Sequence, residues 1–429
     1  MKTKEDILSL IEEEDVEFIR LQFTDVFGKL KNIAVTPRQL ERVVDRNYRI
    51  EATSMFGDVK VIEEDLYLKP DLNTFVILPW RPQQGKVGKL ICDVCYEDGK
   101  PFEMCPRQIL KQVIADMEKK GYSAVIDPEC EFFLFHTDEN GTPTTVTHEQ
   151  AGYMDVGPMD FGENARRDIA LTLEEMGFDV RSSLHEMAPG QHEIDFSGAE
   201  SLSIADALVT FRFAVRSIAK RFGLHATFMP KPIQDQAGSG MHLNISLYKD
   251  NKNVFVPRNG EDITEAARYF MGGVLSHNPA LCAITNPTVN SYKRLLSGFD
   301  APSRAEWSTN GESGAIRLHR GRDEVKVELR FPDSSANPYL AIAASLAAGM
   351  DGIENKTDCG PDAANGNVTA RELPSNLKVA IMALEEDELV KKAIGLELSD
   401  IYTRLKKNEW DDYMRQVTDW EINRYLAKM

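Results

Sequence analysis

The chain has 429 residues, of which 42% are hydrophobic and 28% charged, so it can bury a large core and is long enough for two domains. Its net charge of −18 argues against nucleic acid or an anionic membrane as a partner, because binding to phosphates requires a basic surface. No signal-peptide segment opens the chain, and its longest apolar run, residues 340–350, is too short to span a bilayer, so we expect a cytoplasmic protein.

The six cysteines do not make a disulfide framework in a chain of this length, and cytoplasmic thiols are expected to stay reduced. Cys92 and Cys95 form a Cys-x-x-Cys pair, but no second pair follows at the spacing of a zinc site. The alternating residues around this pair favour packing on a strand.

The first hundred residues predict a small β-rich domain. Apolar spacing indicates a helix over 4–13, and a period of two indicates strands over 16–25 and 30–35. The other elements predicted here are a helix that opens at Pro37 and short strands at 66–68, 74–79 and 89–94. We place the end of this domain near residue 100, so that residues 101–429 form the second domain.

Two acidic residues lie on a strand that the sequence predicts to be buried. A helix over 106–120 ends at Gly121 and leads into a strand over 122–135, which carries Glu129 and Glu131. Residues two apart on a strand face the same side. Burying such a pair is costly unless salt bridges to buried arginines or a bound cation compensate the charges.

A second acidic pair flanks a predicted hairpin. Pro189-Gly190 is a typical tight-turn sequence, and short segments able to form strands lie on both sides of it. The hairpin would bring Glu186 and Glu193 side by side, where two bare carboxylates need a shared proton or a cation. The alternative is a pair of solvated glutamates on a surface hairpin.

A glycine loop and a polar strand face form the next candidate site. Gly238 and Gly240 allow a ligand to approach the backbone closely, and the strand that follows places His242, Asn244 and Ser246 on one face. His242 is either a ligand-binding residue or a satisfied core histidine.

Residues 297–331 contain a loop rich in turn-forming residues and a stretch rich in basic residues. The loop over 297–302 carries Asp300 between Gly and Pro, which fits an active-site flap or an ordinary surface turn. Residues 315–322 are the most basic stretch and suggest a phosphate or carboxylate ligand. The strand over 325–331 then places Lys326, Glu328 and Arg330 on one face.

The remaining predicted elements are helices over 164–176, 203–222, 263–277, 340–355 and 373–429 and a strand over 224–232.

The acidic residues and the histidine predict a metal site. Oxygen ligands with one imidazole suit Mg²⁺ or Mn²⁺, and six ligands suffice for two ions. The predicted ligands are Glu129, Glu131, Glu186, Glu193, His242 and Glu328. Arginines near a metal pair are a recurring arrangement in phosphoryl transfer, and here they would be Arg294, Arg317 and Arg330.

Together these motifs resemble the glutamine synthetase family, class I of the alpha type, over essentially the whole chain. The motifs that carry the resemblance lie at 129–131, 185–193, 231–232, 238–244, 286–294 and 337–339. The resemblance implies an α+β fold, with an N-terminal β-grasp domain and a catalytic domain built on a curved antiparallel sheet with flanking helices. It also implies rings of subunits, with a dodecamer as the expected homo-oligomer and each active site at a subunit interface.

The resemblance further assigns roles to individual residues. Glu131, Glu186 and Glu193 would hold one metal ion, and Glu129, His242 and Glu328 the other. Glutamate would contact Gly238, Arg294 and Arg330; ATP and its phosphates would contact Ser246, Arg317 and Arg322; Glu51, Asp300 and Arg317 would take part in catalysis. The implied reaction is attack of the glutamate γ-carboxylate on ATP, followed by attack of ammonia or an amine on γ-glutamyl phosphate.

Four positions depart from the family pattern. Glu51 stands where the family has Asp, Ala237 replaces Asn, Asp300 replaces Glu, and Glu312 replaces Arg. The longer Glu51 moves its carboxylate, and the shorter Asp300 and the smaller Ala237 are expected to open space where a larger amine enters. We therefore predict that an amine is a better substrate than ammonia. The alternative is a catalytically weak homologue with a regulatory or binding role.

Overall fold

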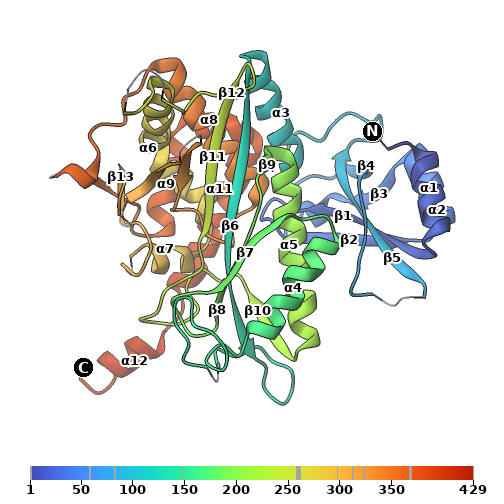
Figure 1. Cartoon of the computed structure of the whole chain (residues 1–429), viewed down its shortest axis with the longest axis horizontal. Coiled ribbons are helices and arrows are strands. Elements are labelled where there is room, and N and C mark those ends of the chain that lie inside the picture. The colour runs from blue at the N-terminus through green and yellow to red at the C-terminus, as the bar shows by residue number, and fades with distance from the viewer. Residues whose placement is uncertain are drawn as a thin grey trace.

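The structure, a computed structural model, describes residues 2–57, 59–81, 84–147, 149–257, 262–296, 298–311, 314–321, 324–366 and 370–428. Within these ranges the chain forms two sheets with helices packed on them, which confirms the α+β class (Figure 1). Glu312 and Arg322, both singled out above, lie outside the described residues.

The N-terminal sheet is mixed, with the spatial order β2-β1-β5-β4-β3. Its strands are β1 Val16–Thr24, β2 Leu30–Val35, β3 Tyr48–Glu51, β4 Asp65–Ile77 and β5 Lys86–Cys95. β1 pairs antiparallel with β2 and parallel with β5. The helices of this region are α1 Lys4–Glu13, α2 Pro37–Arg46 and the short 3₁₀ helix η1 Ala52–Met55. The boundary near residue 100 stays a prediction.

The second sheet is larger and almost entirely antiparallel, with the order β16-β13-β14-β15-β11-β6-β8-β7 along its main path. Its strands are β6 Tyr122–His136, β7 Val180–His185, β8 Gln191–Phe196, β9 Ala199–Glu200, β10 Leu224–Thr227, β11 Met241–Lys249, β12 Lys252–Asn253, β13 Arg304–Ser308, β14 Gly314–Arg320, β15 Val325–Leu329 and β16 Arg371–Glu372. Among the described pairs of this sheet, only β13 and β14 run parallel.

Helices cover this sheet and extend to the C-terminus. They are α3 Pro106–Lys119, α4 Glu163–Glu175, α5 Ser201–Arg221, α6 Glu265–Thr285, α7 Val289–Leu295, α8 Pro338–Asn355, η2 Ala363–Asn365, α9 Leu377–Glu386, α10 Glu388–Ile394, α11 Leu396–Met414 and α12 Asp419–Tyr425. None of the helices in the described ranges has the length and apolar character of a membrane span.

Three of the predicted elements take another form in the structure for local reasons. The strands expected at 66–68 and 74–79 form one strand, β4, with an irregularity between Asp71 and Val76. Thr74 holds this irregularity, since its Oγ1 donates to Asp71 O (2.7 Å) and accepts from Ile91 N (2.8 Å). α6 continues beyond His277 through Pro279, because the buried residues of its last turns offset the backbone hydrogen bond that proline removes.

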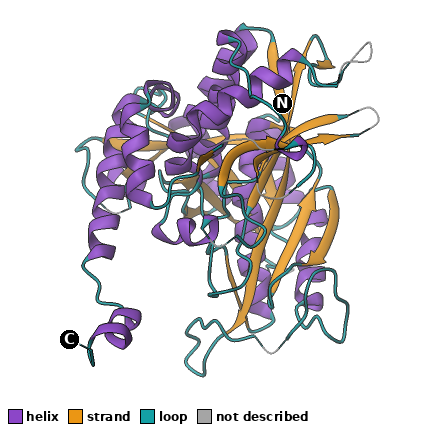
Figure 2. Cartoon of the chain, turned by 90° about the vertical axis from the view of Figure 1, so that its left-hand side faces the viewer, coloured by secondary structure: helices purple, strands orange, loops and turns teal. Residues whose placement is uncertain are grey.

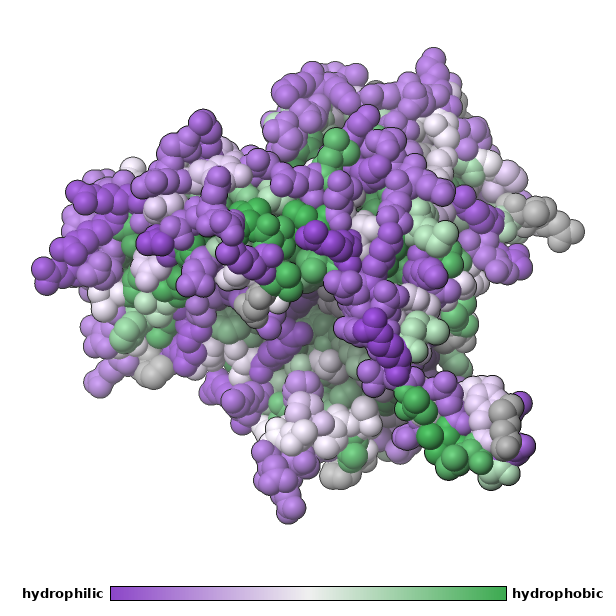
Figure 3. Space-filling view, turned by 180° about the vertical axis from the view of Figure 1, so that it is seen from behind, coloured by the Kyte–Doolittle hydropathy of each residue, from purple (hydrophilic) through white to green (hydrophobic). Residues whose placement is uncertain are grey.

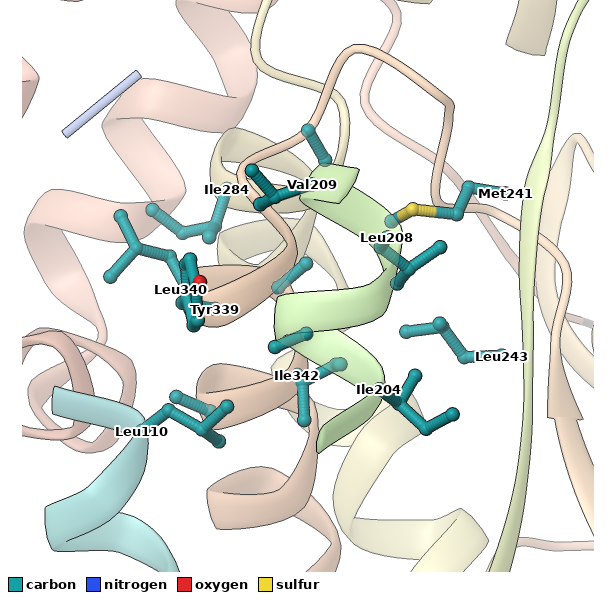
Figure 4. Packing of buried hydrophobic residues seen from close by; sticks show 14 of the residues in the cluster. Leu110, Ile204, Leu208, Val209, Met241, Leu243, Ile284, Tyr339, Leu340 and Ile342 are labelled. Atoms are coloured by element: carbon teal, nitrogen blue, oxygen red, sulfur yellow. The ribbon is translucent and has the colours of Figure 1, made fainter. Parts of the chain in front are cut away.

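The main core lies between the large sheet and α8. α5 fills this space, with Ile204, Leu208 and Val209 packed among Met241 and Leu243 of β11 on one side and the residues of α8 on the other (Figure 4). All of these side chains are buried. This packing holds β11 and the neighbouring β6 rigidly in place.

A network of ion pairs joins the N-terminal sheet to two helices of the rest of the chain. Arg107 of α3 is buried, and its guanidinium contacts Asp71 (2.8 Å), Asp93 (2.7 Å) and Asp206 (2.8 Å). Lys111 adds a contact to Asp93 at 2.5 Å. We call these five residues the junction network. It connects β4 and β5 of the N-terminal sheet with α3 and α5.

Candidate active site

The predicted hairpin is present and forms one wall of the site. β7 and β8 pair antiparallel, and Gly190 in the turn has φ 75°, which glycine adopts without strain. Glu186 follows the end of β7 and Glu193 lies on β8, and their carboxyl groups lie close enough to influence each other's pKa. The hairpin therefore brings the two glutamates together as the sequence predicted.

Strand register brings the other predicted ligands to the same place. Glu131 on β6 is opposite Glu193 on β8, and Glu129 on β6 is opposite His242 on β11. Glu328 on β15 is opposite Asn244 on β11. We call the resulting set the carboxylate cluster; its members are Glu129, Glu131, Glu186, Glu193, His242 and Glu328. Four adjacent strands thus carry five of its six residues, and the hairpin turn carries Glu186.

His242 lies at the centre of the carboxylate cluster. Its Nδ1 is 3.1 Å from Glu129 Oε2 and 3.1 Å from Glu328 Oε1, and its Nε2 is 3.9 Å from Glu131 Oε1. The ring is buried, and among the described residues its Nε2 makes no hydrogen bond. A buried nitrogen that faces a carboxylate without a hydrogen bond fits a metal ligand.

The electrostatics divide the carboxylate cluster into two halves. Burial lowers the pKa of His242, but Glu129 and Glu328 raise it overall to about 10. In the other half, burial and the charge of Glu131 raise the pKa of Glu186 to about 7. Burial, Asp195 and Glu131 likewise raise the pKa of Glu193. The half around Glu131 therefore carries negative charge that the protein does not fully compensate, and it requires protons or a cation.

A second buried group lies behind the hairpin. His185 Nε2 contacts Glu149 Oε1 at 2.8 Å, and Glu149 also accepts from Gly190 N at 2.5 Å. His192 Nδ1 contacts Arg166 Nη1 at 2.9 Å. The arginine would repel a cation, so this group is better explained as support for the hairpin than as a metal site.

Two predicted arginines border the carboxylate cluster. Arg294 of α7 is buried and donates to the carbonyl oxygens of Phe331 (3.0 Å) and Arg330 (3.1 Å). Arg330 follows β15 and contacts Glu328 Oε1 at 3.2 Å and Asp300 Oδ1 at 2.9 Å. The carboxylate of Asp300 is therefore paired with Arg330, one of the two arginines at the site.

The glycine loop approaches these groups closely. A Cβ added at Gly240 would lie 2.7 Å from Arg294 Nη2 and 2.9 Å from His242 Nε2. A Cβ at Gly238 would lie 2.1 Å from Pro230 O. The backbone thus enters the site where a side chain would not fit, as the glycines predicted.

A cleft of about 400 Å³ opens beside Glu129 and Asn244. Its basic lining residues are Arg181, His319, Arg320 and Lys326. Arg317 is opposite Glu328 across β14 and β15, so it shares the sheet face of that ligand. Ser246 lies farther along β11 and is buried, and its hydroxyl has no hydrogen-bond partner among the described residues.

Glu51 and Ala237 lie differently from the other predicted site residues. Glu51 is exposed on β3, and no described contact joins it to the carboxylate cluster. Ala237 is buried in an apolar cluster with Phe133, Phe135 and Ala188. The expectation that Ala237 opens space for the nucleophile is therefore wrong, because its methyl group fills an apolar pocket.

Three further residues belong to the site and were not predicted for it. Tyr153 is half exposed, and burial and the charges of Glu186, Glu193 and Asp300 raise its pKa. Burial and the charge of Asp195 raise the pKa of Glu193, and Gln191 Nε2 donates to Glu131 Oε2 at 2.8 Å. The alternation of Gln191, Glu193 and Asp195 on one strand face was the available signal.

Known proteins match the chain from end to end. The profile "Glutamine synthetase, beta-Grasp domain" matches residues 15–97, and "Glutamine synthetase, catalytic domain" matches residues 103–425. The glutamine synthetase of Clostridium saccharobutylicum is 49% identical over 439 residues, which cover 99% of both chains. That of Staphylococcus aureus strain Mu50 is 46% identical over 440 residues, 99% of this chain and 98% of the relative.

Solved structures agree with this result. A GmaS/ADP complex has a TM-score of 0.90 and 32% identity, and covers 98% of this chain and 99% of its own. GmaS without ligand has a TM-score of 0.88 at the same identity. With both domains matched and its acidic strands in the arrangement described above, the chain belongs to the glutamine synthetase family.

Proposed function

We propose that the carboxylate cluster binds two divalent ions, Mg²⁺ or Mn²⁺. Glu131, Glu186 and Glu193 would hold one ion, and Glu129, His242 and Glu328 the other. The uncompensated charge of the first set, and the Nδ1 of His242 at 3.1 Å from both Glu129 Oε2 and Glu328 Oε1, support this assignment. Such ions would neutralise charge that develops on the phosphates of ATP during transfer.

The enzyme is an ATP-dependent ligase that joins the γ-carboxylate of glutamate to a nitrogen nucleophile, either ammonia or an amine. We assign glutamate binding to Arg294, Arg330 and Gly238, and place ATP in the cleft beside Glu129. Arg317 and Ser246, with Arg322, are the proposed phosphate and nucleotide contacts. The observation that carries this proposal is a cluster of five carboxylates and one imidazole, in which the imidazole and three of the carboxylates are buried, bordered by two buried arginines.

In the proposed reaction, a γ-carboxylate oxygen of glutamate attacks the γ-phosphorus of ATP and ADP leaves. Arg294 and Arg330 orient glutamate for this attack. The nitrogen nucleophile then attacks the acyl carbon of γ-glutamyl phosphate, loses a proton and displaces phosphate. Glu51 of a neighbouring subunit and Asp300 are the proposed groups around that nucleophile.

Trapping the acyl phosphate tests the reaction. With ATP, glutamate and hydroxylamine, the enzyme should form γ-glutamyl hydroxamate and one ADP for each product. Glu193→Ala should abolish the reaction, whereas Lys378→Gln, at an exposed position on α9, should leave it unchanged. Absence of glutamate-dependent ADP formation with ammonia, hydroxylamine and every amine would instead support a non-catalytic homologue.

We propose a primary amine as the preferred nucleophile. Glu51 displaces its carboxylate by roughly 1 Å relative to Asp, and a shift of that size costs about a hundredfold in rate. Asp300 is paired with Arg330 in this structure, which withdraws it from the nucleophile. Both changes weaken a site for the small ammonium ion.

Steady-state kinetics with saturating ATP and glutamate test this preference. The best primary amine or polyamine should give a higher kcat/KM than ammonia. The double variant Glu51→Asp, Asp300→Glu should shift the ratio toward ammonia. A higher kcat/KM for ammonia than for every amine tested would refute the proposal.

We also propose a ring-based homo-oligomer, a dodecamer by family resemblance, that works in the cytoplasm. The exposed position of Glu51 supports sites shared between subunits. α12 projects from the body of the chain (Figure 2), and the space-filling view shows apolar residues gathered on this projection (Figure 3). Its exposed apolar residues are Trp420, Ile422, Tyr425 and Leu426. Sedimentation that shows fully active monomers at micromolar concentration would contradict the proposal.

A further inference from the structure

His319 connects the cleft with the carboxylate cluster. It lies on β14, diagonal to Glu328 on β15, because Arg317 is opposite Glu328 and His319 is opposite Lys326. Long side chains reach across such a diagonal. His319 Nε2 is 2.5 Å from Glu328 Oε2, while the imidazole remains 39% exposed and lines the cleft.

The two oxygens of Glu328 have different surroundings. Oε1 faces the cluster, at 3.1 Å from His242 Nδ1 and 3.2 Å from Arg330 Nη1. Oε2 faces away from these groups and contacts His319. Since the Glu328 side chain is buried, loss of the imidazole would leave a buried carboxylate oxygen without this contact and free the group to rotate.

We propose that His319 is a positioning residue that holds Glu328 with Oε1 directed at the ion shared with Glu129 and His242. Outer-shell partners of metal ligands orient those ligands, and their loss typically costs about 10- to 100-fold in metal affinity or activity. The role of His319 rests on the proposed metal assignment. It is specific to one of the two ions, because the described contacts of His319 with the carboxylate cluster are those with Glu328.

Binding of Mn²⁺ to the nucleotide-free enzyme tests the proposal. Calorimetry with wild-type protein should resolve two ions per chain. His319→Ala should weaken one of them about 10- to 100-fold and leave the other within about twofold. His319→Gln, whose amide can still donate to Glu328, should recover part of this affinity.

Lys378→Gln, at an exposed position on α9 outside the cleft lining, is the control. It should bind both ions like the wild type. In kinetics, His319→Ala should raise the KM for the divalent ion while the KM for glutamate stays unchanged. Melting curves in chelator should show that the His319 variants remain folded.

Three results would overturn the inference. The first is His319→Ala with both affinities within twofold of the wild type. The second is an equal loss at both ions, which would indicate general damage to the site. The third is a loss in His319→Gln as large as in Glu328→Gln, which would make His319 a direct ligand. If wild-type protein bound no Mn²⁺, the metal assignment itself would fail together with this role.

Discussion

Two groups of charges, each only partly exposed to solvent, differ in how far the protein compensates them. In the junction network, the Arg107 guanidinium meets three carboxylates at 2.7–2.8 Å, and Lys111 adds a further positive charge. In the carboxylate cluster, five carboxylates surround one imidazole, and the half around Glu131 has raised pKa values at Glu186 and Glu193.

This difference separates a structural group from a ligand site. The junction network is complete within the chain and joins the N-terminal sheet to α3 and α5. The carboxylate cluster is complete only with added positive charge, so removing a charge should have opposite effects on stability in the two places.

The largest effect is expected at the junction network. Arg107→Gln removes the central cation and leaves three partly buried carboxylates facing one another, so it should lower the free energy of unfolding by about 3–5 kcal/mol. Denaturant unfolding in chelator measures this loss. Arg42→Gln, at an exposed position on α2, is the control. A loss below about 1 kcal/mol would mean that the network contributes no more than a surface ion pair.

For Glu131→Gln we expect the opposite change, a gain in the stability of the metal-free protein. The substitution removes a negative charge but keeps an oxygen that can accept from Gln191 and Gly240. Activity should fall by more than about a hundredfold, since loss of an outer-shell partner alone costs up to that amount. The metal-free variant should nevertheless melt at a higher temperature than the metal-free wild type. A lower melting temperature in chelator would contradict our view of the cluster.

Divalent ions should stabilise the wild type but act much less on Glu131→Gln. At 100 times its dissociation constant, an ion that binds only the folded state adds about 2.7 kcal/mol. Melting curves with Mn²⁺ and with chelator, at constant ionic strength, measure this shift. In Arg107→Gln the added stability should persist, because the junction network lies outside the cluster. An unchanged melting temperature in the wild type would rule out a structural role for the ions.

A smaller effect is expected at His277 on α6, whose ion pairs with two carboxylates form only when the imidazole is protonated. His277 Nδ1 is 2.7 Å from Asp387 and Nε2 is 3.3 Å from Asp351. Burial lowers the pKa of His277, but the hydrogen bond and charge of Asp387, with Asp351, raise it overall above 6.5. Its stabilisation is therefore fully present below pH 6.5 and disappears as the pH rises through the folded-state value.

His277→Gln tests this sign. The variant should lose about 1 kcal/mol relative to the wild type at pH 5.5 and less at pH 9. Unfolding curves at the two pH values, both in chelator, give the comparison. An equal loss at both pH values would show that the charge of His277 plays no part.

Local patterns in the sequence were sufficient to predict which residues of the candidate site share a strand face or flank the hairpin turn. Glu129 and Glu131 share a face because side chains alternate along any strand, and Pro189-Gly190 predicts its turn without reference to the rest of the chain. The same alternation placed His242 and Asn244 together. The motifs also identified the family, and with it the two-domain α+β fold.

Only the tertiary structure decided which strands are neighbours. β6 lies between β8 and β11, and this order, set by packing and register far apart in the sequence, brings Glu131 opposite Glu193 and Glu129 opposite His242. The register of β14 and β15 likewise makes Glu328 the diagonal neighbour of His319. Tertiary packing also buries Ala237 in an apolar cluster and leaves Glu51 apart from the carboxylates. Alternation along a strand is a local property of the backbone, whereas contact across strands depends on non-local register, which residue spacing does not encode.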